Sequence, residues 1–156
     1  MKHLLFLIIL FYFSACIVEY NSLYTATFIN TTTHSIKILF YKNGSVSSTD
    51  TIKLLQGQEF EFASGSIRGN TSAPGFSSRY FGSSDDFIIV IYDDLYKITH
   101  YAITPLQLAP KYYLQVSDRN FRNPNSYRFE STPLSKHSNK NDHYYEFTEQ
   151  DYLDAK

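Results

Sequence analysis

The chain contains almost no cysteine. Only Cys16 is present among its 156 residues, which excludes an internal disulfide and any metal site that needs two thiolates. Tryptophan is absent, and neither sign of charge dominates, because 14 lysines and arginines stand against 15 aspartates and glutamates. Proteins that bind nucleic acid usually carry a basic patch or stripe. The composition therefore predicts no nucleic-acid partner.

Long hydrophobic runs are also scarce, and the longest lies at the start of the chain. Residues 4–13 are apolar without interruption, after Lys2 and before the small residues Ser14 and Ala15. This order of charge, apolar stretch and small residues is typical of a secretory signal. A membrane-spanning helix needs about 20 apolar residues. We therefore expect residues 1–15 to be a cleaved signal peptide and not a spanning anchor.

Cleavage is predicted between Ala15 and Cys16. The sequence Phe13-Ser14-Ala15-Cys16 resembles the bacterial lipobox, although Phe13 stands where an aliphatic residue is usual. The resemblance implies that Cys16 is lipidated, becomes the new N-terminus and is acylated again, with palmitate. Anchoring by two or more chains is stable, since each buried methylene contributes about 0.8 kcal/mol. The alternative is an ordinary signal peptide that ends near a cysteine.

The remaining chain has the length and composition of one β domain. Cleavage of residues 1–15 from the 156-residue chain leaves 141 residues, which can bury a core of their own. We expect residues 16–23 to be a tether and residues 24–156 a single domain. Its 14 tyrosines and 13 phenylalanines favour strands. About nine strand-like runs predict an antiparallel β-sandwich, Ig-like or related, with a closed barrel as the alternative.

Local patterns place the predicted elements. In the run 86–92, all residues after Asp86 are hydrophobic, which predicts a central strand that is buried on both faces. Thr148 followed by Asp151 resembles a capping box and predicts a short helix, held in place by docking of Tyr152 and Leu153. The predicted strands cover residues 24–30, 35–41, 49–54, 58–63, 86–92, 95–102, 111–117, 126–130 and 143–147.

Two stretches are predicted to be loops. Residues 131–141 form a polar linker, and residues 64–85 form a long segment rich in glycine and serine. Loops longer than about 12–15 residues are usually functional or disordered. Flat rings and guanidinium groups are typical of binding surfaces, and Tyr80, Phe81 and Tyr112 are candidates to stack on sugar rings. The alternative is that the loop rings pack against the sandwich edge. The full candidate ligand-binding set is Arg68, Phe76, Arg79, Tyr80, Phe81 and Tyr112.

Motifs for catalysis and metal binding are missing. Residues 65–69 place their serine one position too early for the G-x-S-x-G nucleophile elbow. His137 and His143 lie in polar sequence and are expected at the surface, so no metal site and no cofactor are predicted. A hydrolase whose site combines His34 or His100 with a distant Ser or Asp is an alternative, because such sites are defined by geometry.

Four short segments carry a wider resemblance: residues 13–16 (FSAC), 28–34 (FINTTTH), 91–94 (IYDD) and 147–152 (FTEQDY). With them, the chain resembles the small single-domain lipoproteins of unknown function from Bacteroidetes. The resemblance implies a bacterial envelope protein that is lipid-anchored at the outer membrane and faces the periplasm or the surface. It brings no catalytic residues. Thr51, in Asp50-Thr51-Ile52, resembles the O-glycosylation site of exported proteins from the same group.

The leading hypothesis is a non-catalytic, lipid-anchored structural or interaction module of the cell envelope. Its expected partners are the membrane, through the anchor, and a glycan or an envelope protein. The first rival is a glycan-binding module of a surface uptake system. The second rival is the hydrolase with a dispersed active site.

Overall fold

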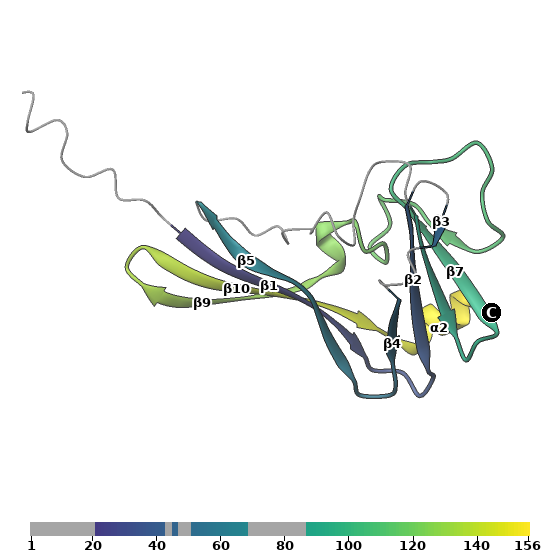
Figure 1. Cartoon of the computed structure of the whole chain (residues 1–156), viewed down its shortest axis with the longest axis horizontal. Coiled ribbons are helices and arrows are strands. Elements are labelled where there is room, and N and C mark those ends of the chain that lie inside the picture. Colours follow the sequence, from purple (N-terminus) through teal and green to yellow (C-terminus); the bar gives the residue numbers. More distant parts are fainter. Residues whose placement is uncertain (1–20, 43–44, 47–50, 69–86) are drawn as a thin grey trace, which may run out of the picture.

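The computed structural model describes residues 21–42, 45–46, 51–68 and 87–156. These residues form ten strands in two sheets, with a short 3-10 helix and one α-helix (Figure 1). Each sheet runs from one edge strand to another, so the described strands do not close into a barrel. The predicted all-β class, with two sheets and a short C-terminal helix, is confirmed.

The first sheet has four long strands. Its order is β5-β1-β10-β9. β1 pairs antiparallel with β5 but parallel with β10, which comes more than a hundred residues later. This parallel pair makes the sheet mixed, where the sequence predicted an antiparallel arrangement. The strands are β1 (Asn21–Asn30), β5 (Glu59–Arg68), β9 (Arg128–Ser135) and β10 (Ser138–Phe147).

The second sheet has the order β3-β2-β6-β7-β8, and β4 pairs with β2. Its strands are β2 (Ile36–Lys42), β3 (Ser45–Val46), β4 (Ile52–Leu54), β6 (Phe87–Tyr92), β7 (Tyr96–Tyr101) and β8 (Tyr112–Tyr113). The 3-10 helix η2 (Pro124–Ser126) precedes β9, and the helix α2 (Glu149–Ala155) follows β10.

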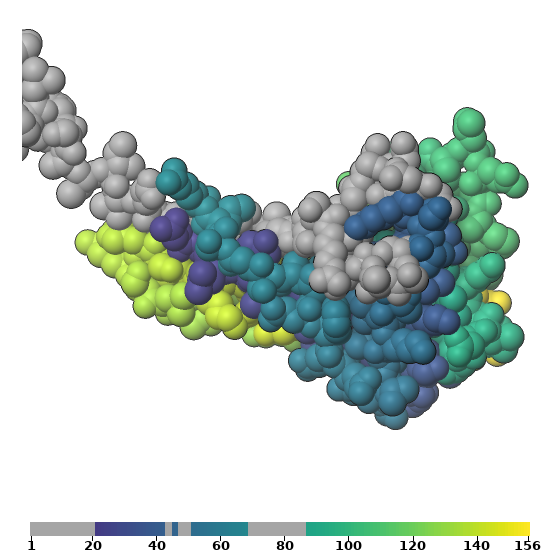
Figure 2. Space-filling model, in the orientation of Figure 1, coloured from purple at the N-terminus to yellow at the C-terminus, as the bar shows by residue number. Residues whose placement is uncertain are grey.

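The two sheets overlap over only part of their length. Figure 1 shows that the four-stranded sheet extends well past the six-stranded one. The start of β1 and the hairpin of β9 and β10 lie at one end, and the second sheet with α2 lies at the other. The space-filling view in Figure 2 shows the same elongated body.

The core lies where the sheets meet. β2 contributes Ile36, Ile38 and Phe40, which are at most 2% exposed, as its alternating pattern predicts. The first sheet and the segment before η2 supply rings instead of aliphatic chains. Phe121 lies among them, with ring centroids 5.1 Å from Phe28 and 4.4 Å from Tyr145. Burial of each such side chain contributes about 1.5–3 kcal/mol.

Several local predictions are wrong in their partners or lengths. The predicted strands 49–54 and 58–63 follow each other in sequence, as the two strands of a hairpin would, but they do not pair, because β4 joins β2 while β5 joins β1. The chain therefore changes sheets at Gly57, whose φ of 72° suits glycine. β6 is central, but its residues alternate between buried and half-buried, so only one face is fully covered.

The predicted loops and tether also contain strand. β5 continues to Arg68, inside the predicted 64–85 loop, and the rest of that loop lies outside the described residues. The predicted linker 131–141 forms most of the β9–β10 hairpin. Residues 21–23, predicted as tether, belong to β1. In each case a polar sequence is held as strand by backbone pairing with a neighbour, which composition does not reveal.

Candidate functional site

Three of the segments singled out by resemblance meet at one place, around His34. His34 Nδ1 lies 2.5 Å from Asp93 Oδ2, in the turn between β6 and β7. His34 Nε2 lies 3.4 Å from Glu149 Oε2, at the start of α2. The imidazole stacks on Tyr152, with centroids 3.6 Å apart and an interplanar angle of 12°. We call His34, Asp93, Glu149 and Tyr152 the His34 junction.

Backbone donors complete the His34 junction. Asp93 Oδ1 accepts from the backbone N–H of Ser35 at 2.9 Å, and Glu149 Oε1 accepts from that of Thr33 at 2.8 Å. The hydrogen bond with His34, followed by that from Ser35, lowers the pKa of Asp93 below its usual value. Each carboxylate therefore links the loop after β1 to another element.

Asn30 explains why the loop after β1 can present His34 in this way. Its side chain is fully buried, and Nδ2 donates to the carbonyls of His34 at 2.8 Å and of Leu54 at 3.1 Å. Its Oδ1 accepts from the N–H and the hydroxyl of Thr32, at 3.0 and 2.8 Å. A buried amide saturated in this way fixes the loop as an Asx-type turn.

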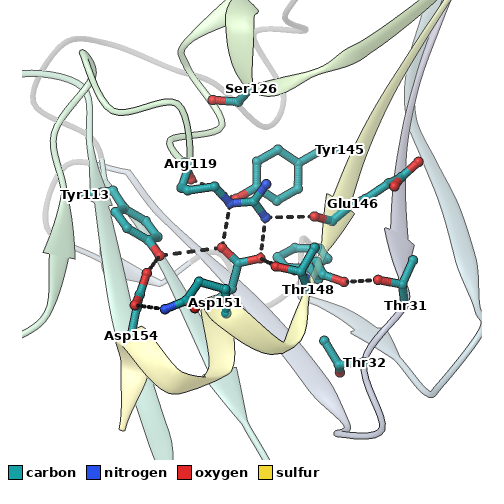
Figure 3. A network of polar contacts seen from close by, with 12 residues as sticks. Thr31, Thr32, Tyr113, Arg119, Ser126, Tyr145, Glu146, Thr148, Asp151 and Asp154 are labelled. Carbon is teal, nitrogen blue, oxygen red and sulfur yellow. Dashed lines mark hydrogen bonds and ion pairs between the residues drawn. The ribbon is translucent and has the colours of Figure 1, made fainter.

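A second network joins α2 to the segment after β8 (Figure 3). Arg119 Nε donates to Asp151 Oδ1 at 2.7 Å, and Nη2 bonds Asp151 Oδ2 as well as the carbonyl of Glu146 at 2.8 Å. The Tyr113 hydroxyl donates to Asp154 Oδ2 at 2.5 Å. We call Arg119, Asp151, Tyr113 and Asp154 the α2 clamp.

Asp151 also caps the helix. Its Oδ2 accepts from the N–H of Thr148 at 2.8 Å and from the Thr148 hydroxyl at 3.0 Å, in the reciprocal manner of a capping box. The sequence predicts this cap correctly. Burial raises the pKa of Tyr113, and its bond to Asp154 adds to that effect. Burial alone would lower the pKa of Arg119, but Asp151 outweighs it and the pKa is raised. Arg119 therefore keeps its positive charge and Tyr113 remains a neutral hydroxyl donor, and both side chains bond α2.

The structure does not assemble the predicted hydrolase site around His34. An acid does meet the imidazole, as a catalytic triad requires, but Nε2 faces the Glu149 carboxylate where a triad needs a hydroxyl. The nearby Ser35 hydroxyl donates to Asp93 instead, at 3.2 Å. Both ring nitrogens of His34 are thus directed at carboxylates.

His100 is equally unsuited to the role of base. It is 2% exposed, stacks on Phe121 with centroids 3.9 Å apart and meets the Tyr113 ring edge-on. Burial, with a smaller effect from Arg119, lowers its pKa to about 3. Its Nδ1 is buried without a hydrogen-bond partner. Among the described residues, no group of three or more His, Cys, Asp or Glu side chains is arranged to hold a metal ion.

Most of the predicted ligand-binding set cannot be placed. Phe76, Arg79, Tyr80 and Phe81 lie outside the described residues, as do Ala15 and Cys16. Arg68 ends β5 in the first sheet, whereas Tyr112 lies in β8 of the second. Tyr112 is 38% exposed, with its ring centroid 6.3 Å from that of Tyr101. The structure does not bring these two residues onto one sheet. Thr51, the candidate modification site, is half-buried just before β4.

A surface feature that the sequence analysis missed lies along the edge of β7. A hollow of about 270 Å³ separates this edge from the segment before β8 and from the end of α2. Three lysines from distant parts of the chain line it, which is why no local pattern could indicate it. Its lining consists of Leu95, Tyr96, Lys97, Thr99, Ala109, Pro110, Lys111, Ala155 and Lys156.

The chain matches no protein-family model, no curated protein and no solved structure among those compared. The resemblance to Bacteroidetes lipoproteins therefore stays a prediction. Within the described ranges, no helix combines the length and the apolar character needed to span a membrane.

Proposed function

We propose that this protein is a lipid-anchored envelope protein whose two-sheet domain is a non-catalytic interaction module. The observation that carries the proposal is the position of the single cysteine. Cys16 follows an apolar run and two small residues, in the order that an export signal requires. An unpaired thiol at that point is explained by acylation.

The start of the first sheet supports this arrangement. β1 begins at Asn21, five residues after Cys16. A chain of five residues spans at most about 18 Å, so the acylated residue would hold the start of β1 close to the lipid. β1 then runs for ten residues, or about 33 Å at the usual rise per residue. The six-stranded sheet lies at the opposite end of the molecule from the start of β1 (Figure 1) and is free to face a partner.

The polar clusters support a non-catalytic role. In the His34 junction and in the α2 clamp, the charged groups hold elements together and are directed at one another. A catalytic group needs a free position for substrate within hydrogen-bond reach. The two clusters therefore hold the second sheet and α2 in a fixed geometry.

Mass spectrometry of the protein from the membrane fraction tests the anchor. We expect an N-terminal peptide that starts at Cys16 and carries the mass of several acyl chains. Cys16→Ala should abolish this peptide and release the protein from the membrane. A mature N-terminus elsewhere, with a free Cys16 thiol, would contradict the proposal and indicate a soluble exported protein.

A glycan-binding role is the second candidate, and the partly exposed Tyr112 beside Tyr101 favours it. Aromatic faces are common contact surfaces because they lose little entropy on binding. Tyr112→Ala is then expected to lower affinity for immobilised envelope polysaccharide at least tenfold, as are Tyr80→Ala and Phe81→Ala. Leu106→Ala, which removes an exposed aliphatic side chain, serves as the control. Unchanged affinity in the tyrosine and phenylalanine variants would exclude this role.

A further inference from the structure

The edge of β7 is covered over only part of its length. β8 pairs with Thr99 and His100 alone, and no other described strand pairs with Tyr96–Ile98 on that side. β6 occupies the opposite side along the whole strand. Among the described strands, Tyr96–Ile98 therefore have a paired neighbour on one side only, and we call these residues the half-open edge. The 270 Å³ hollow lies beside them.

The backbone at this edge is oriented to receive another strand. The N–H of Thr99 donates to the carbonyl of Lys111 at 3.0 Å, so Thr99 faces the β8 side. Backbone groups alternate in direction along a strand, which means that Lys97 directs its N–H and C=O to the same side. An extended peptide placed in the hollow would meet these groups in the geometry of a sheet.

The side chains around the hollow define the chemistry of its occupant. Lys97, Lys111 and Lys156 are all exposed, and no ion pair of the described residues engages them. No acidic side chain lines the hollow, whereas Leu95, Tyr96 and Ala155 add apolar surface. The lining comes from both sides of the sheet, because Lys97 and Tyr96 point to opposite faces.

We propose that this half-open edge binds an acidic, extended segment of a partner protein as an added strand. Main-chain hydrogen bonds supply affinity in this mode of recognition, and alternate side chains supply specificity. Acidic residues would meet the lysines, and apolar residues would lie on Leu95 and Tyr96. A second copy of the same edge is a poor occupant, because it would set lysine against lysine.

The inference rests on the proposed interaction role and names the partner's chemistry. It also agrees with the position of the edge, at the end of the molecule opposite to the start of β1 (Figure 1). An anchored protein would present this end away from its point of attachment. The anchor and the edge nevertheless depend on different residues and can be tested separately.

The test uses full-length protein purified from the membrane fraction and a fluorescein-labelled peptide of four Val-Glu repeats, followed by fluorescence anisotropy. We expect saturable binding, and a loss of at least tenfold in affinity for the double variant Lys97→Glu, Lys111→Glu. Lys53→Glu reverses an exposed lysine on β4 and is the matched control, expected to change affinity less than twofold. Unfolding midpoints of all variants establish that they are folded.

A peptide of the same sequence with alternate backbone nitrogens methylated separates strand addition from simple charge attraction. We expect it to bind at least tenfold more weakly, since methylation removes the main-chain donors. Equal binding of the two peptides would overturn the inference, as would equal losses in the Lys53 control or tighter binding of dextran sulfate than of the peptide. If Cys16 is acylated but the peptide does not bind, the edge site is rejected and the anchor stands. If the peptide binds but Cys16 is not acylated, the anchor is rejected and the edge site stands.

Discussion

At the scale of single residues, the buried Asp151 contributes more to the free energy of unfolding than an exposed acid can. Its side chain is 2% exposed, and it both pairs with Arg119 and caps α2 through Thr148. Removing one partner of a buried ion pair costs about 3–5 kcal/mol because the other charge stays buried and unpaired. Arg119 is 31% exposed, which places the expected cost at the lower end of that range.

Asp151→Asn is therefore expected to reduce the free energy of unfolding by about 3 kcal/mol. Urea denaturation followed by circular dichroism measures the change. Asp118→Asn, an exposed acid in the same segment as Arg119, is the control and should change stability by less than about 0.5 kcal/mol. Equal effects of the two substitutions would show that the α2 clamp contributes nothing specific.

His100 makes stability depend on pH. Burial lowers its pKa to about 3 in the folded protein, while the unfolded chain takes up the proton near pH 6.5. Below pH 6.5 the unfolded state thus binds one more proton than the folded state. The contribution is fully present above pH 6.5 and is lost as the pH falls toward 3, at about 1.4 kcal/mol per pH unit.

His100→Leu should flatten this dependence between pH 6.5 and pH 4.5, because leucine is similar in volume and does not titrate. The free energy of unfolding measured by urea denaturation across this range provides the test. His137→Leu, in the turn between β9 and β10, controls for the loss of an imidazole. An unchanged slope in His100→Leu would mean that other groups cause the acid sensitivity.

At the scale of elements, packing against the second sheet decides which side chains of α2 are buried. The sequence predicts that Tyr152 and Leu153 both dock, but Leu153 is 56% exposed. Tyr152 instead contacts His34, Tyr92 and Tyr96. A helix of seven residues is too short to be stable alone, so this docking and the α2 clamp hold it.

Tyr152→Ala is expected to cost about 2 kcal/mol, less than a fully buried ring because Tyr152 is half-buried. It should also speed amide hydrogen exchange throughout α2. Leu153→Ala, one residue away, should cost less than about 0.5 kcal/mol and leave exchange unchanged. The reverse order of effects would contradict the docking shown by the structure.

The elements differ in how well local sequence predicts them. β2 was predictable because its apolar residues alternate and every second one is buried. The turn at Asp93 and Asp94 was predictable as well, since both residues tolerate the positive φ that they adopt, 53° and 56°. β9 was missed over most of its length because most of its residues are polar and all are exposed, and pairing with β10 alone makes it a strand.

At the scale of the whole molecule, Phe121 connects the sheets. It is fully buried, and its ring contacts Phe28 and Phe147 of the first sheet and His100 of the second. Yet Phe121 belongs to neither sheet, since it lies in the segment between β8 and η2. The core therefore depends on an irregular segment reaching the space where the sheets meet.

Phe121→Ala should lower the free energy of unfolding by about 4 kcal/mol, a large share of the 5–15 kcal/mol typical of a domain. Urea denaturation monitored by far-ultraviolet and near-ultraviolet circular dichroism should show one cooperative transition, at a lower midpoint. Phe121→Leu keeps most of the volume and should cost about half as much. Separate transitions by the two probes would contradict this expectation, because they would indicate a state that keeps its strands after the packing of the rings is lost.

For the candidate sites too, the sequence indicates residue types, whereas their surroundings depend on contacts between residues that are distant in the chain. Sequence alone named His34 and His100 as reactive candidates, but it could not show that one faces two carboxylates and the other is enclosed by rings. The lysines of the β7 edge come from three segments, and none is unusual in its local sequence. Surroundings that decide a site's chemistry are assembled from residues far apart in the chain.

By itself, the sequence determined the β class, the buried face of β2, the capped C-terminal helix and the pattern that predicts export and anchoring at Cys16. These features depend on neighbouring residues, whose periodicity and turn preferences act locally. Only the tertiary structure decided that β1 pairs parallel with β10, that β4 and β5 belong to different sheets, and that the loop after β1, the turn after β6 and the start of α2 meet around His34. Pairing of distant segments is selected by the packing of one shared core, and that selection involves the whole chain at once.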